Sequence, residues 1–222
     1  MGFVEEPGGG AVRVAADDLL DAMVLAGVQR AWVVLGHDKW DVPAYLAGGH
    51  RPPPELAFLV LRDSPSTPAT VAHSAPWVAE ETVLFGFPDI LFQPRDAFAR
   101  LLGRLQATAA EVVLGLFPAN RPDKVDMVER DEEGRARRIV IKPERTFLDR
   151  AWIIAAWGPA FTRFLRERAA GPAPGRERYV GDVLNEALDE GFTIDTVDFE
   201  DGRFLDVGTV EELRTALQKP PL

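Results

Sequence analysis

The chain has 222 residues, of which 46% are hydrophobic and 27% are charged, so it can bury the core of one compact domain or of two small ones. Its net charge is -10, and a surface that repels phosphodiester backbones disfavours nucleic-acid partners and favours small molecules. The chain has no cysteine, which excludes disulfides and thiolate metal sites and leads us to expect a cytoplasmic protein. It has no apolar stretch near the roughly 20 residues of a membrane helix, so we expect no membrane contact.

Short apolar runs alternate with helical patterns in the first half of the chain. Continuous apolar runs, unlike alternating ones, are typical of strands that helices cover on both faces. This alternation predicts an α/β fold, Rossmann-like, with a mostly parallel, helix-flanked sheet. The expected strands are 31–36, 56–61, 82–87 and 111–117, and the expected helices are 17–26 with Gly27 as its stop, one from Pro68 with Thr67 as its cap, and 96–108.

The pattern changes near residue 122. Residues 126–142 predict an antiparallel hairpin whose polar turn ends at Gly134. We expect one domain over 1–222, made of a flexible start (1–16), a sheet lobe (17–122) and a hairpin lobe (123–222). After the hairpin, the expected elements are a strand at 151–157, helices at 159–168 and 179–189, a strand at 192–199 and a last helix with the capping-box spacing of Thr209 and Glu212.

A single carboxylate, Asp89, stands among the apolar residues of FGFPDILF at 85–92. Burying an unpaired carboxylate there would cost several kcal/mol, so a donor, water or a cation should lie beside it. Its position just past a predicted strand is where open α/β sheets bind ligands. The alternative is a turn aspartate that accepts backbone N–H bonds after Pro88.

Asp206 repeats this pattern in FLDVGTVEEL at 204–213. Two carboxylates at strand ends would suit Mg²⁺, which takes one or two protein carboxylates and completes its shell with water and phosphate, so the pair indicates a phosphate substrate. Alone, Asp206 would more simply complement a helix N-terminus. Lys142, at the end of the hairpin, is either a point charge for a phosphate or an ordinary solvated lysine.

Five segments, taken in order, resemble the sugar-1-phosphate nucleotidyltransferases, the enzymes similar to glucose-1-phosphate thymidylyltransferase. The resemblance covers about residues 17–216 and rests on the order and spacing of the segments. They are LLDAMVLAGVQRAWVVLGHDKWDVPAYL, STPATVAHSAPWV, FGFPDILF, VDMVERDEEGRARRIVIKPE and FLDVGTVEEL.

The resemblance implies a nucleotide-diphospho-sugar transferase-like fold, with the nucleotide on the side of 17–122 and the sugar on the side of 123–222. It implies Mg²⁺ as cofactor, a nucleoside triphosphate and a sugar 1-phosphate as substrates, and is compatible with a homo-oligomer. The implied site residues are Asp89 and Asp206 for the metal, Ser66, Thr67 and Gly86 for the nucleotide, and Lys142 and Asp126 for the sugar phosphate, with Asp89, Lys142 and Asp206 catalytic.

The implied reaction joins a triphosphate such as dTTP to a sugar 1-phosphate such as glucose 1-phosphate and releases pyrophosphate. The alternative is a non-catalytic nucleotide-sugar-binding or regulatory homologue that has lost the loop for the triphosphate. Two departures from the family pattern bear on this choice. Two residues separate Gly86 from Asp89, and Ile141 stands where the family has the glutamate of its Glu-Lys-Pro.

The family also opens with a strand and a glycine-rich loop whose N–H groups and arginine hold the triphosphate. The segment MGFVEEPGGGAVRVAADD shows no such loop, so we expect the fold without its first strand. A gene start placed too far downstream, a degenerate paralogue and a fragment are the three explanations. We favour the misplaced start, because the metal and lysine motifs that remain are those of a working site.

Overall fold

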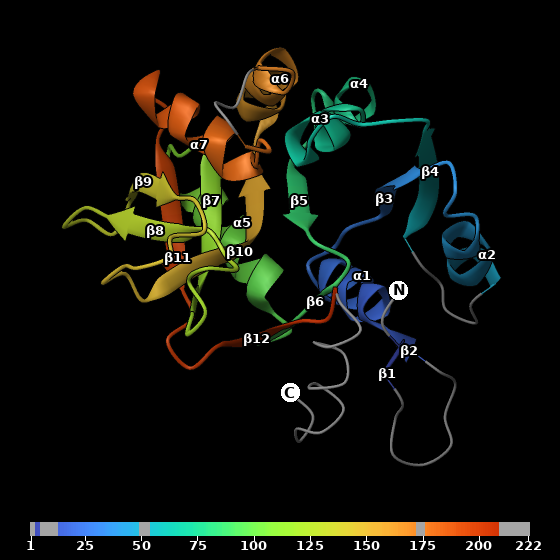
Figure 1. Ribbon diagram of the computed structural model, residues 1–222, viewed down its shortest axis with the longest axis horizontal. Coiled ribbons are helices and arrows are strands. Elements are labelled where there is room, and N and C mark those ends of the chain that lie inside the picture. Colours follow the sequence, from blue (N-terminus) through green and yellow to red (C-terminus); the bar gives the residue numbers. More distant parts are fainter. Residues whose placement is uncertain (1–2, 5–12, 49–53, 172–175, 209–222) are drawn as a thin grey trace.

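The computed structural model describes residues 3–4, 13–48, 54–171 and 176–208 of the chain (Figure 1). Its main sheet has six strands, and β10 is at its centre, because β10 pairs with β7 along one edge and with β5 and β8 along the other. The strands are β5 (Val83–Gly86), β7 (Val112–Pro118), β8 (Met127–Arg130), β9 (Ala136–Val140), β10 (Arg150–Trp157) and β11 (Ile194–Asp198).

The pairing of the strands gives their directions in the main sheet. β5 and β7 are both antiparallel to β10 and therefore run the same way, and β11 is parallel to β7. β8 and β9 form the antiparallel hairpin. The expected fold class, an α/β fold with a mostly parallel, helix-flanked sheet and an antiparallel hairpin, is therefore confirmed.

Three further strand pairs lie outside the main sheet. β3 (Arg30–Gly36) and β4 (Glu55–Leu61) are parallel, and in Figure 1 this pair stands apart from the six-stranded sheet. β6 (Ile90–Gln93) and β12 (Arg203–Asp206) are antiparallel, as are β1 (Phe3–Val4) and β2 (Arg13–Val14). Of the start expected to be flexible, the described residues thus form β1, β2 and the beginning of the first helix.

Helices cover both faces of the main sheet. α6 and α7 pack on one face with one set of β7 and β10 side chains, and α1 and α5 pack on the other. β7 is buried from Val112 to Phe117, as its continuous apolar run predicts. The helices are α1 (Ala15–Leu25), α2 (Asp41–Gly48), α3 (Thr67–Ala72), α4 (Ala75–Val78), α5 (Ala97–Ala107), α6 (Pro159–Arg168) and α7 (Val180–Asp189). None of these helices is long and apolar enough to cross a bilayer.

Local signals explain most helix ends. α1 stops as expected at Gly27, whose φ of 90° is costly for residues with a side chain. The expected cap of α3 was wrong by one residue: Ser66, not Thr67, is the N-cap, since the Ser66 hydroxyl accepts the Ala69 N–H at 3.4 Å. The last helix expected around Thr209 and Glu212 lies outside the described residues.

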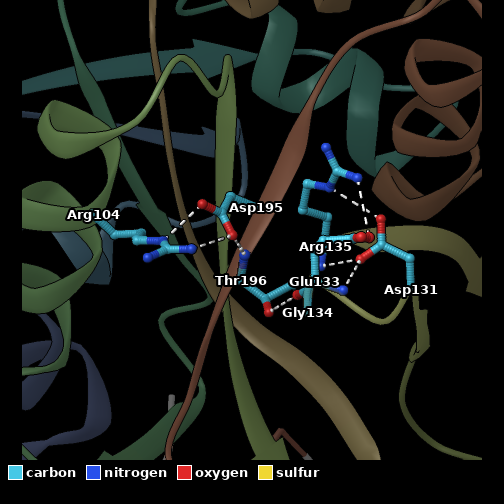
Figure 2. Close-up of polar contacts among 7 residues, drawn as sticks. All are labelled: Arg104, Asp131, Glu133, Gly134, Arg135, Asp195 and Thr196. Atoms are coloured by element: carbon cyan, nitrogen blue, oxygen red, sulfur yellow. Dashed lines mark hydrogen bonds and ion pairs between the residues drawn. The ribbon is translucent and has the colours of Figure 1, made fainter.

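Polar contacts attach the hairpin to β11 (Figure 2). Asp195 of β11 is buried and accepts two hydrogen bonds from Arg104 of α5, at 2.7 and 3.2 Å. The next residue, Thr196, donates from its hydroxyl to the carbonyl of Gly134 in the hairpin turn. The turn itself is held by Asp131, which accepts from the Arg135 backbone at 2.8 Å and side chain at 3.0 Å.

The outer strand of the hairpin is held by a side chain. Asn185 of α7 accepts the Ile139 N–H at 2.8 Å and donates to the Ile139 carbonyl at 2.8 Å. Both backbone groups of Ile139 are therefore satisfied as they would be by a neighbouring strand.

Packing between β7 and β10 gives a direct test of this fold. A Cβ at Gly115 of β7 would lie 2.6 Å from Ile154 Cγ1 and 3.2 Å from the Phe199 ring. We expect Gly115→Ala to lower the free energy of unfolding by about 1 to 3 kcal/mol through overpacking, as measured by urea unfolding. Gly103→Ala, on the exposed side of α5 with nothing within 4 Å of its Cβ, is the control and should raise it by about 0.5 to 1 kcal/mol. A Gly115→Ala variant as stable as the original chain would contradict the close contact.

Candidate active site

Two carboxylates distant in sequence meet beside the β6–β12 pair. Asp89 closes the turn that leads from β5 into β6, and Asp206 is the last residue of β12. The antiparallel register places Asp206 opposite Ile90, and the Val207 N–H donates to the Asp89 carbonyl at 2.9 Å. The strand pair therefore fixes both residues at the same end of one small ribbon.

Both side chains face one point next to Gly208. A Cβ on Gly208 would lie 2.8 Å from Asp89 Oδ2 and 3.1 Å from Asp206 Oδ1. The Gly208 N–H also donates to Asp206 Oδ1 at 2.9 Å, which orients that carboxylate. The sequence pattern predicted that the two carboxylates face one site, and they do.

This pair suits a hard cation that is only partly held by protein. Mg²⁺ keeps several waters and binds proteins through one or two carboxylates together with substrate phosphates. Within the described ranges, no group of three or more histidine, aspartate or glutamate side chains could enclose a metal ion. An open two-carboxylate site is therefore the arrangement that the described residues offer, and Mg²⁺ fits it.

A cavity of about 820 Å³ lies next to this carboxylate pair. Asp89 and Gly208 line it, and so do Thr67 and Gly86, two residues that the family resemblance assigns to the nucleotide. Gly86 has a packing reason as well, since a Cβ there would lie 2.6 Å from Leu19 Cδ1. Ser66, the third residue assigned to the nucleotide, is buried as the cap of α3 and is not part of the lining.

A second polar group forms where the hairpin meets α7. Lys142, just after β9, is exposed and has an unusual φ of 37°. Its Nζ lies 4.0 Å from the centroid of the Tyr179 ring, a cation–π contact. Tyr179 is the N-cap residue of α7, so the lysine is held at the positive end of that helix.

Asp126 lies beneath this lysine at the start of the hairpin. Burial raises its pKa from 3.8 to about 6, and the nearby charge of Lys142 offsets only part of that rise. Asp126 Oδ1 and the indole N–H of its neighbour Trp152 are both buried and have no hydrogen-bond partner of good geometry among the described residues. A carboxylate oxygen and an N–H donor that could each form a further hydrogen bond thus lie close together.

Aromatic rings pack together near residues of both polar groups. Phe87, two residues before Asp89, packs against Trp152 with 5.8 Å between ring centroids, and Phe85 packs on Phe87 at 5.0 Å. The predicted residues therefore form two groups, a carboxylate pair at the cavity and a lysine–aspartate group on the hairpin.

Trp152 and Tyr179 were not predicted as site residues. Trp152 is a core residue with 4% exposure. Its place beside Asp126 depends on β10 pairing with β8, where Ala151 is opposite Met127. Tyr179 precedes a helix that was predicted, but nothing local in the sequence connects it with Lys142.

Comparison with known proteins identifies the family and the fold of this chain. Residues 14–220 match the family model described as nucleotidyl transferase. UDP-glucose pyrophosphorylase in complex with UDP-glucose has a similar structure, with a TM-score of 0.79 and 15% identity over 92% of this chain and 85% of that chain. The comparison with curated proteins finds no match.

Two further solved structures have the same fold. One is a protein from Bacillus anthracis assigned as a glucose-1-phosphate thymidylyltransferase, in complex with sucrose, with a TM-score of 0.78 and 13% identity over 92% of this chain and 81% of that chain. The other is the inositol-1-phosphate CTP transferase from T. maritima, with a TM-score of 0.72 and 15% identity over 94% and 84% of the two chains.

The buried Asp126 gives a prediction for stability against pH. Its carboxyl group loses its proton near pH 3.8 in the unfolded chain and at about 6 in the folded one. Between these values the folded state binds more protons, so this group makes the protein less stable as the pH rises from about 4 to 6. Asp126→Asn should remove that dependence, and its stability relative to the original chain should rise by up to about 3 kcal/mol from pH 4 to pH 7 in urea unfolding.

The matched control for this measurement is Glu132→Gln, which removes a carboxylate from the exposed hairpin turn. Its stability relative to the original chain should follow no such trend. A constant difference between Asp126→Asn and the original chain across this pH range would show that Asp126 is not buried in the folded protein.

Proposed function

The chain belongs to the nucleotidyl transferase family, and from this membership we propose that it transfers a nucleotidyl group from a nucleoside triphosphate to a sugar 1-phosphate and releases pyrophosphate. The observation that carries the proposal is the convergence of Asp89 and Asp206 on one point at the end of the cavity. Such a pair of hard oxygen ligands suits chemistry on phosphates.

The two carboxylates would hold Mg²⁺. When bound, the ion supplies positive charge that neutralises phosphate oxygens and so lowers the barrier to transfer. The Gly208 N–H keeps the Asp206 carboxylate turned toward the ion site. Because Gly208 has no side chain, the point that both carboxylates face stays open.

The nucleotide would lie along the cavity. Thr67 offers a hydroxyl group at the start of α3, and Gly86 of β5 also lines the cavity. The α-phosphate would then be near Asp89, and a sugar-phosphate oxygen would attack its phosphorus in line with the departing pyrophosphate. No covalent intermediate with the protein is needed.

The sugar phosphate would bind on the hairpin side. The Lys142 ammonium is exposed next to the start of α7, where both its charge and the helix dipole favour an anion. Asp126, beneath it, would accept a hydrogen bond from a sugar hydroxyl. The partly buried ring of Phe87, which packs against the core residue Trp152, would lie near the sugar.

The relatives suggest which substrates to test. The names of UDP-glucose pyrophosphorylase and of the protein assigned as a glucose-1-phosphate thymidylyltransferase suggest glucose 1-phosphate as the first acceptor to test. UTP and dTTP are then the first donors to test. The inositol-1-phosphate CTP transferase adds CTP and inositol 1-phosphate to the panel.

One observation favours a second candidate, a nucleotide-sugar-binding protein without turnover. Ile141 replaces the glutamate that the family pattern expects before the lysine, and its Cδ1 packs 2.5 Å from the position that a Cβ on Gly181 would take. The side chain is therefore turned into the α7 contact and offers no carboxylate to a sugar. Nucleotide-sugar binding in isothermal titration, with no pyrophosphate release in any assay, would favour this candidate.

The test of the proposal is Mg²⁺-dependent pyrophosphate release from a triphosphate panel with glucose 1-phosphate. Asp89→Asn should abolish both this release and Mg²⁺ binding in calorimetry, because the isosteric amide removes the charge. Its free energy of unfolding should change by no more than about 1 kcal/mol, since the exposed side chain leaves no cavity.

Gly208→Ala is the matched variant, since it keeps both carboxylates and places a methyl group where they converge. We expect it also to weaken Mg²⁺ binding, whereas Gly103→Ala should leave Mg²⁺ binding unchanged. Clear loss of stability in Asp89→Asn, with Mg²⁺ binding and release retained, would end the metal-ligand assignment in favour of a turn-capping role.

Replacement of Lys142 tests the acceptor side. Lys142→Met should weaken glucose 1-phosphate binding roughly 10- to 100-fold in calorimetry, the typical value of one charge-assisted contact, while nucleotide binding stays the same. Lys142→Arg should recover part of the affinity. Arg145→Met, an exposed cation of the same loop, is the control. An equal loss of affinity in both Met variants would show that Lys142 acts only through net charge.

A further inference from the structure

The hairpin places residues 126 and 141 side by side on neighbouring strands. β8 and β9 are antiparallel, with Met127 opposite Val140, so continuing the register by one step sets Asp126 opposite Ile141. Directly opposite residues of an antiparallel pair point to the same face, with Cβ atoms about 5 Å apart. A carboxylate at either of these two positions would therefore reach the same region beside α7.

Gly181 of α7 shows where the two side chains meet. A Cβ on this residue would lie 2.6 Å from Asp126 Oδ2 and 2.5 Å from Ile141 Cδ1. The carboxylate oxygen and the end of the isoleucine side chain therefore lie against the same point of the α7 backbone. Both fit there because Gly181 has no side chain.

The two side chains have different neighbours beyond that point. Ile141 packs with the core on the α6 and α7 side of the sheet. Asp126 lies close to Lys142: burial raises the pKa of Asp126, while the Lys142 charge and a hydrogen bond from the Lys142 backbone lower it. Its Oδ1 is buried without a hydrogen-bond partner in the part of the chain that the structure describes. The carboxylate beside the lysine is thus that of residue 126.

A lysine and a carboxylate side by side suit a ligand that combines an anion with a hydrogen-bond donor. The Lys142 ammonium attracts a phosphate as a point charge, whereas an ionised Asp126 only accepts hydrogen bonds and repels a phosphate. The phosphate and the donor must therefore be different groups of one molecule. A sugar or polyol monophosphate has both groups, and a simple alkyl phosphate has only the first.

We propose that Asp126 takes the place of the glutamate that the family pattern has at residue 141, and that it selects phosphate monoesters whose alcohol part carries further hydroxyl groups. The carboxylate then comes from the facing strand of the hairpin and still lies beside Lys142. Asp126, Ile141 and Gly181 form one coupled unit, in which either strand can supply the carboxylate. The assignment rests on the proposed function, since it concerns the acceptor of the same site.

Removing the carboxylate is the first part of the test. Binding is measured by isothermal titration, at a pH well above the pKa of Asp126, with glucose 1-phosphate and with methyl phosphate, which carries no further hydroxyl. Asp126→Ala should weaken glucose 1-phosphate binding about 10- to 100-fold, the typical value of a hydrogen bond to a charged group. It should not weaken methyl phosphate binding. The isosteric Asp126→Asn should act in the same direction.

Returning the carboxylate from the other strand is the second part. Asp126→Ala combined with Ile141→Glu should regain at least about tenfold of the lost affinity for glucose 1-phosphate. The matched control combines Asp126→Ala with Ile141→Gln, which has the same shape without the charge and should regain little. Urea unfolding of each variant verifies that the compared proteins are folded.

Three results would overturn the assignment. Glucose 1-phosphate binding could be undiminished in both Asp126→Ala and Asp126→Asn, Ile141→Glu could recover no more affinity than Ile141→Gln, or methyl phosphate could lose as much affinity as glucose 1-phosphate. The last result would show that Asp126 acts only by positioning Lys142.

The same variants separate this assignment from the proposed reaction. The expected binding pattern without pyrophosphate release from any triphosphate would keep the role of Asp126 and end the proposed transfer. Pyrophosphate release by the original chain, with unaltered glucose 1-phosphate binding in the Asp126 variants, would keep the transfer and end the role of Asp126.

Discussion

The burial of β7 and β10 against each other is the constraint on which the rest of this structure depends. Gly115 leaves room for Ile154, and this close approach allows the two most apolar strands to pair along their length while helices cover both faces. The other edge of β10 then carries β5 at one end and β8 at the other. One strand therefore sets the positions of both the Asp89 turn and the hairpin with Lys142.

The candidate site is built at the ends of these strands and gains little from the core itself. A short antiparallel ribbon, β6 with β12, brings together two carboxylates that lie far apart in the sequence. The hairpin brings Asp126 under Lys142, and burial raises the pKa of that carboxyl group to about 6. The candidate site thus consists of two small attachments to the main sheet, and Phe87, close to Asp89 in sequence, contacts Trp152 beside the hairpin.

The fold and half of the site could be predicted from the sequence because their signals are local. Apolar runs marked the strands of the main sheet, Gly27 marked a helix end, and the two aspartates followed the same apolar pattern. The strand pair β6–β12, helix α2 and the capping role of Ser66 were missed, because each depends on tertiary partners or on a one-residue choice between two hydroxyl side chains. Continuous apolar patterns also predicted that β3 and β4 are buried, yet both strands are only partly buried, and all residues of β3 line the cavity.

The two hydrogen bonds between the Asn185 side chain and the Ile139 backbone affect how the protein behaves in a concentrated solution. Strand edges are the usual places where one polypeptide adds to the sheet of another and starts an aggregate. At β9 the amide of Asn185 already occupies the donor and the acceptor of Ile139, and the exposed arginines at 137 and 138 add like charge to the same border. Along this described border of the sheet, the Asn185 side chain and the repulsion of the two arginines therefore oppose growth into fibrous assemblies.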